Sequence, residues 1–340
     1  MLEVLPKDII LAHWQYGQVR RGQIVASLKA GFSVICAPAL CRYSDVIQPN
    51  AAGFDNIDRM VRTASSLAGR GVLGVVNTWW TPWRFVRDAA MPAVAYTGCV
   101  LKTGRPAAKG AFFGRFIRDY FGPDSAAAAR AMWSLHKLTL RSWELSAALA
   151  DSSQKVQDAT SLVRGAGFAA RARKIDRCVA MLADASGSIR KHKAQYSAIV
   201  LAGRIAAACM AMAKSWRDVD KLLRRAETAS GRGGAPEKVT ASLAAAAEKL
   251  TNARRNLDEI YQLTCREWDR TRYSRDAKKL FRPGAPIPCP EDSLLGKLYR
   301  CRKYQRAVSA KLTRAVAACR SEGNLTFGVE KLLDVSDNPT

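Results

Sequence analysis

The sequence predicts two parts, an α/β segment with parallel strands followed by an all-helical segment. The stretch from Gly71 to Trp80, GVLGVVNTWW, contains an apolar run without polar alternation, which is typical of a strand buried on both faces of a parallel sheet. Further along, apolar residues recur at alternating spacings of three and four from 175 to 213 and from 239 to 264. That pattern indicates two long packed helices.

The composition is that of an ordinary folded protein with room for two domains, at 340 residues, 48% hydrophobic and 24% charged. We find no 18-residue apolar run and no signal peptide, so no membrane span and a cytoplasmic location are expected. The nine cysteines are scattered, which favours reduced thiols over disulfides, and no metal site or cofactor is predicted.

The charge is strongly basic and uneven. The formal net charge is +25, of which +18 falls on residues 125–340. Such an excess favours an anionic partner, nucleic acid foremost, although a solvated helical surface would show the same composition. No nucleic-acid-binding motif accompanies it.

Along the first 101 residues the pattern predicts strands and helices in alternation. Strands are expected at 8–17, 32–38 and 71–80, and helices at 18–30, from a cap at Asp55 or Asn56 to about residue 67, and at 82–101 with an interruption at Pro92. Short connections between them predict parallel strands with right-handed crossovers. Three such units do not close a barrel, and they leave open sheet edges.

Aromatic and polar residues follow each predicted strand. His13, Trp14 and Tyr16 follow the first, Tyr43-Ser44-Asp45 follow the second beyond Pro38, and Asn77-Thr78-Trp79-Trp80 follow the third. In order and spacing, this segment resembles strands six to eight of the glycoside hydrolase family 20 barrel, the β-N-acetylhexosaminidases. The resemblance implies that residues 1–101 are the last three β/α units of a partial (β/α)8 TIM barrel.

The resemblance also implies roles for individual residues. Trp14 and Trp79 correspond to the walls around an N-acetylhexosamine, and Tyr43 and Asp45 to the residues that bind its acetamido group and hydroxyls. His13, Tyr16 and Trp80 are secondary candidates for the same site. If the last strand continues through its end, Trp79 and Trp80 point to opposite faces, so only one of them can face a pocket.

Catalysis is not expected from this chain alone. Family 20 chemistry needs an Asp-Glu pair at the end of strand four, which would precede residue 1, and Asp45 is a single well-placed carboxylate. The helix acids Asp55, Asp58 and Asp88 are interpreted as solvated or capping residues. No catalytic residue is assigned, and an N-acetylhexosamine-containing glycan is the expected ligand. A complementing barrel half or a second copy could cover the open edges.

Residues 102–124, rich in glycine and proline, are predicted to connect the barrel segment to a helical domain at 125–321, and 322–340 to fray. Ser125 is a candidate helix cap. The two long helices at 175–213 and 239–264 should form an antiparallel hairpin about the turn at 230–236, with His192 as a polar residue in their seam. A last helix should begin after Asp292 or Ser293.

Overall fold

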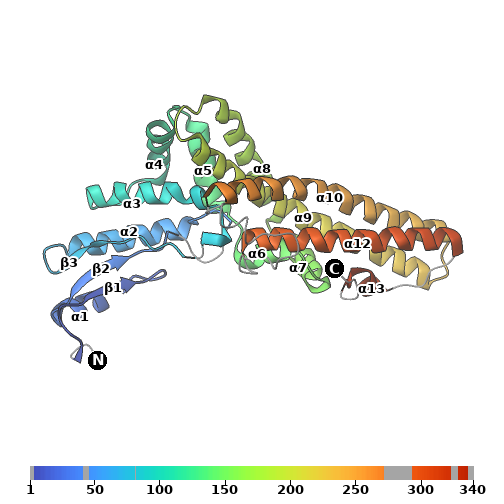
Figure 1. The fold of residues 1–340 in the computed structure, drawn as a ribbon, viewed down its shortest axis with the longest axis horizontal. Coiled ribbons are helices and arrows are strands. Elements are labelled where there is room, and N and C mark those ends of the chain that lie inside the picture. Colours follow the sequence, from blue (N-terminus) through green and yellow to red (C-terminus); the bar gives the residue numbers. More distant parts are fainter. Residues whose placement is uncertain (1–3, 41–45, 81, 272–292, 323–327, 336–340) are drawn as a thin grey trace. The chain divides into compact units, whose positions relative to one another are not determined.

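The computed structural model describes residues 4–40, 46–80, 82–271, 293–322 and 328–335. The chain divides into two compact units, and two of the three boundaries between them fall inside helices. Unit 1 comprises residues 1–139 and 177–203, and unit 2 comprises residues 140–176 and 204–340. A small parallel sheet with many helices confirms the α/β plus helical class (Figure 1).

Unit 1 contains a three-stranded parallel sheet in the order β1-β2-β3. Its strands alternate with two helices, as the sequence predicts: β1 (Ile10–Trp14), α1 (Arg21–Lys29), β2 (Ser33–Ala37), α2 (Ala51–Ser66) and β3 (Val72–Val75). Pairing continues past the named strands, since the Leu40 amide donates to the Thr78 carbonyl at 2.9 Å. The carboxyl ends of the strands therefore lie at the same edge of the sheet.

One face of the sheet packs against both helices. Val34 and Cys36 of β2 are buried in a cluster with Ile24 of α1, Met60 of α2 and Leu67, which caps the C-terminal end of α2. The order of the strands and the shared cluster are what two successive right-handed crossovers produce. The helix α2 begins earlier than predicted, because Asn50 and not Asp55 or Asn56 caps it, with the Asn50 side chain accepting from the Gly53 amide at 3.0 Å.

The opposite face of the sheet is open within unit 1. Ile10, Leu73 and Val76 are 52, 58 and 51% exposed, and Ala12 lies between Ile10 and Trp14 on the same side of β1. The prediction that the 71–80 strand is buried on both faces is therefore wrong for unit 1. An apolar run shows that both faces of a strand are apolar, but not that an element covers each of them.

The rest of unit 1 is helical, and two predictions there are corrected. Up to residue 139 the elements are two 3₁₀ turns at Pro82–Arg84 and Arg87–Ala90, α3 (Met91–Thr103), α4 (Lys109–Phe116), a π turn at Ile117–Phe121, and α5 (Ala126–Leu138). Pro92 does not interrupt a helix at 82–101 but lies in the first turn of α3, where no amide donor is needed. The segment predicted as a connector holds α4. Ser125 caps α5 as predicted, accepting from the Ala128 amide at 3.2 Å.

Unit 2 is built from helices. Its elements are α6 (Ser142–Ala148), α7 (Ser153–Arg164), α10 (Pro236–Thr271), α12 (Leu294–Glu322), α13 (Val329–Leu333) and parts of α8 (Phe168–Ala185) and α9 (Lys193–Gly231). Ion pairs from Arg204 to Glu259 at 2.6 Å and from Lys249 to Asp218 at 3.2 Å join α9 and α10. Their reversed order confirms the antiparallel hairpin.

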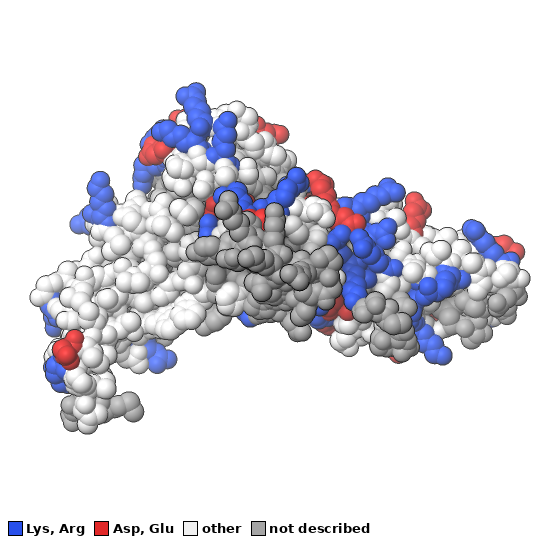
Figure 2. Space-filling view, in the orientation of Figure 1, with Lys and Arg blue, Asp and Glu red and all other residues white. Residues whose placement is uncertain are grey.

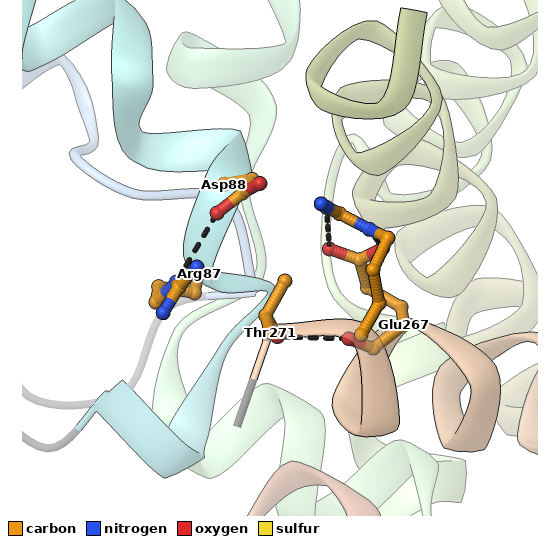
Figure 3. Close-up of polar contacts among 5 residues, drawn as sticks. Arg87, Asp88, Glu267 and Thr271 are labelled. Carbon is orange, nitrogen blue, oxygen red and sulfur yellow. Dashed lines mark hydrogen bonds and ion pairs between the residues drawn. The ribbon is translucent and has the colours of Figure 1, made fainter. Parts of the chain in front are cut away.

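Near its end, α10 is tied by contacts within one turn, where Thr271 Oγ1 donates to the Glu267 carbonyl at 2.8 Å (Figure 3). Ser293 caps α12, accepting from the Gly296 amide at 2.9 Å, while Asp292 lies outside the described residues. The tail was predicted to fray, but α13 forms there, and its Leu333 carbonyl accepts from Tyr304 Oη at 2.7 Å.

The first long helix predicted for the second half is wrong. Instead of one helix at 175–213, α8 ends at Ala185, a 3₁₀ turn follows at Ser186–Ser188, and α9 begins at Lys193. The apolar spacing misses this break because Leu182 and Tyr196 are buried on either side of it and Ile189 is buried within it. His192 is not a seam residue. It is exposed at the start of α9 with a positive φ of 49°, and its ring stacks on Tyr120 with centroids 4.0 Å apart.

Among the described helices, α9 alone has the length and apolar composition that a membrane crossing requires. However, 72% of its most apolar window is buried inside the protein. Burial of that extent is also found in the core helix of a soluble protein.

Candidate functional site

The carboxyl end of the sheet gathers a cluster of aromatic rings, as the sequence predicts. Trp14 ends β1, Trp80 follows β3, and their rings stack with centroids 4.1 Å apart at an interplanar angle of 21°. Tyr16 meets Trp14 edge-on at 5.6 Å and shares a 2.9 Å hydrogen bond with Thr78 Oγ1. Since β1 and β3 flank β2, the two tryptophans come from opposite sides of the central strand.

Trp79 lies apart from this pair. Its ring stacks on Phe85 at 6.0 Å and packs against the buried cluster of Phe85 and Ala90. Its indole Nε1 is buried and has no hydrogen-bond partner among the described residues, and the same holds for the Asn77 Oδ1 two residues earlier. A buried polar atom without a partner costs free energy, so both atoms are available to a ligand or to a neighbouring segment.

His13 points away from the aromatic cluster. Its Nε2 lies 2.9 Å from Ser27 Oγ of α1, on the face that the helices cover, and burial lowers the pKa of its imidazole. Alternation along β1 explains the separation, because neighbouring residues of a strand face opposite sides. The structure therefore groups Trp14, Tyr16 and Trp80, but not His13.

A buried amide fixes the strand ends that hold these rings. Asn56 of α2 is fully buried, its Nδ2 donates to the Gln15 carbonyl at 2.7 Å, and its Oδ1 accepts from the Ala39 amide at 3.2 Å. It thus links the chain leaving β1 to the chain leaving β2. Asn56 lies on the buried stripe of α2, three residues after Gly53 and four before Met60, and that position is a signal in the sequence.

Two carboxylates of unit 1 differ from the prediction that the helix acids are solvated or capping, whereas Asp55 is exposed as predicted. Tyr43 and Asp45 lie outside the described residues. Asp58 and Asp88 are buried rather than solvated. Asp88 accepts from Arg87 Nε at 3.1 Å (Figure 3), and Asp58 pairs with Lys109.

Asp58, Lys109 and Tyr96 form a largely buried polar cluster in unit 1. Tyr96 Oη donates to Asp58 Oδ1 at 2.6 Å, and Lys109 Nζ donates both to Asp58 and, at 2.7 Å, to Tyr96 Oη. Burial, followed by the Asp58 contact, raises the pKa of Tyr96. The three side chains come from α2, α3 and α4, so the cluster joins these helices rather than facing an open site.

Comparison of the chain with protein-family models gives no match, and comparison with curated proteins gives none either. Within the described residues, no three His, Cys, Asp or Glu side chains converge as they would around a metal ion. What the sheet end offers chemically is exposed aromatic surface with hydroxyl and indole donors beside it. That combination suits binding of a small polar ligand with apolar faces.

Proposed function

We propose that the chain is related to the family 20 glycoside hydrolases and binds N-acetylhexosamine-containing glycans at the carboxyl end of its sheet without hydrolysing them. The observation that carries the proposal is the exposed Trp14–Trp80 pair beside Tyr16 at the ends of parallel strands. Sugar rings present apolar C–H faces that stack on indoles, while hydroxyl groups such as that of Tyr16 orient them. Tyr43, Asp45 and Trp79 belong to the same proposed site by the resemblance.

The exposed apolar face of the sheet supports the hypothesis of a partial barrel. In a closed (β/α)8 barrel, helices cover the outer face of each strand, and bulky apolar side chains fill the interior. Ile10, Ala12, Leu73 and Val76 occupy the face of the sheet opposite the helices, where such an interior would lie. The proposal therefore includes a covering partner, either a complementing barrel half or a second copy of the chain. Sedimentation of the purified chain distinguishes a self-associating protein from one that stays monomeric and needs another partner.

Replacing Trp14 or Trp80 by alanine is expected to weaken binding of N-acetylglucosamine several-fold, because a stacking aromatic ring contributes on the order of 1 kcal/mol. The measurement is a tryptophan-fluorescence titration of the full chain, with Trp79→Ala tested in the same way. Trp143→Ala is the matched control, since Trp143 is exposed on α6 in unit 2. Equal affinity for wild type and both variants would remove the stacked pair from the site.

A parallel assay with a chromogenic N-acetylglucosaminide tests the absence of catalysis. No hydrolysis is expected, because no second carboxylate is assigned beside Asp45. Turnover in a preparation freed of contaminating hexosaminidase would contradict the proposal and would make Asp45 the first residue to examine.

A second candidate function is attachment of the basic helical part to an anionic partner, nucleic acid foremost. The +18 of residues 125–340 favours it, and on the face seen in Figure 2 charged side chains are sparse over the strands and dense over the helices of unit 2. Filter binding of nucleic acid to the full chain tests it. Affinity must fall steeply with salt if phosphates are contacted.

A further inference from the structure

Unit 2 contains a cavity of about 810 Å³ between the C-terminal end of α7 and the stretch of α9 from residue 217 onward. Six basic side chains line it, and they are Arg164, Arg217, Lys221, Arg224, Arg225 and Arg232. On α9, Arg217 lies four residues before Lys221, and Arg224 and Arg225 lie three and four residues after it, so these side chains form one stripe along the helix. Arg232 directly follows the end of α9. We call this cavity the basic groove.

The two carboxylates in the groove already have cationic partners. Asp218 pairs with Arg217 at 2.6 Å and with Lys249 at 3.2 Å, and Asp220 pairs with Arg224 at 3.1 Å. Burial would raise the pKa of Asp218, but hydrogen bonds from Arg217 and Lys249 outweigh it and hold that pKa below its usual value. Both carboxylates are therefore compensated within the protein.

Four cations of the groove remain uncompensated. Arg164, Lys221, Arg225 and Arg232 are exposed, and none of them forms an ion pair with a carboxylate in the described part of the chain. Like charges that converge on one concavity repel each other, and an anion placed among them relieves that repulsion.

A buried hydroxyl in the wall of the groove also has no partner. Thr160 of α7 is only 6% exposed, and its Oγ1 forms no hydrogen bond with any described residue. Such an atom costs free energy unless something occupies the space beside it. Thr160 lines the groove one helical turn before Arg164, so a ligand held by the cations can accept its hydrogen bond.

We propose that the basic groove binds a small ligand carrying two or more phosphate groups. The volume lies within the range of small-molecule sites, and three of the four uncompensated cations are arginines, whose planar guanidinium groups bind phosphate oxygens in pairs. A discrete concavity with a buried donor favours a small ligand over nucleic acid, which is contacted over an extended surface. The inference rests on the second candidate function, binding of an anionic partner, and specifies the site and the class of ligand.

Titration of the full chain with sodium tripolyphosphate, followed by calorimetry at physiological ionic strength, tests this proposal. The triple variant Arg164→Gln/Lys221→Gln/Arg225→Gln is expected to bind at least about tenfold more weakly than wild type. Equal affinity of the variant and wild type would overturn the proposal.

The matched control removes the same charge elsewhere in unit 2. Arg255, Arg306 and Arg314 are exposed on α10 and α12 and do not line the groove. Their triple replacement by glutamine should leave tripolyphosphate binding within about twofold of wild type. A loss as large as that of the groove variant would mean that net charge alone attracts the anion, and the groove would be rejected.

Thr160→Val tests whether the Thr160 hydroxyl contacts the ligand or is only buried. Valine keeps the shape and lacks the donor, so tripolyphosphate should bind several-fold more weakly while the melting temperature of the ligand-free chain does not fall. Unchanged affinity would contradict the role given to Thr160.

A fluorescein-labelled single-stranded DNA oligonucleotide distinguishes binding of a small phosphate ligand in the basic groove from attachment of nucleic acid to the basic helical part. Displacement of the oligonucleotide by tripolyphosphate, in wild type but not in the groove variant, supports a phosphate-binding groove. Oligonucleotide binding that survives in the groove variant, with no binding of tripolyphosphate to wild type, would overturn the groove and leave nucleic-acid attachment standing.

Discussion

Replacing Asp58 by asparagine is expected to lower the free energy of unfolding of unit 1 by about 3 kcal/mol, because it leaves the charge of Lys109 buried without its partner. The side chains of Lys109 and Asp58 are 15 and 11% exposed. Asp58 also accepts from Tyr96, so the substitution disturbs two contacts at once. Urea denaturation followed by tryptophan fluorescence measures the loss.

Asp55→Asn is the matched control, since Asp55 is exposed on the same helix and the chemical change is identical. It should shift the urea midpoint very little. Removing both charges, with Asp58→Asn and Lys109→Met together, should cost less than the sum of the single changes. A small effect of Asp58→Asn would contradict this expectation and would show that Asp58 is solvated, as the sequence predicted for this residue.

Lowering the pH from about 6.5 to about 4 is expected to destabilise unit 1 by on the order of 3 kcal/mol through His136 alone. His136 of α5 is fully buried, and the hydrogen bond from its Nδ1 to the Pro49 carbonyl is 2.7 Å long. Burial lowers the pKa of the imidazole to about 4, although the Pro49 contact opposes the shift. Below pH 6.5 this histidine binds a proton in the unfolded chain but stays neutral in the folded chain. The free energy of unfolding therefore falls with pH until the pKa of the folded state is reached.

Urea midpoints at several pH values between about 5 and about 7, where ordinary carboxylates are mostly ionised, measure the slope. His136→Gln should be less stable than wild type near neutral pH but should lose most of the dependence on pH in this range. His192→Gln, at an exposed position, should keep it. A wild-type slope that persists in His136→Gln would assign the effect to another group.

Local and repetitive features were predictable from the sequence. The three strands, their parallel order and the cap at Ser125 follow from residue types that act within a few positions. The hairpin of α9 and α10 follows from a long apolar period with a glycine-rich turn. The aromatic cluster was predictable because parallel strands bring their carboxyl ends together. The sequence predicted Trp79 as the partner of Trp14 in the site, whereas the ring that stacks on Trp14 is that of Trp80.

Partners distant in sequence were decided only by the tertiary structure. Asp58 and His136 sit on apolar stripes of their helices, but a stripe does not reveal that Lys109 or the Pro49 carbonyl meets them. The basic stripe of α9 can be recognised in the sequence, but the sequence does not show that Thr160 of α7 lines the same groove. The spacing of apolar residues shows which side chains of a helix are buried. Polar groups buried beside them need hydrogen-bond partners, and the element that packs there supplies those partners. Only the folded chain determines which element that is.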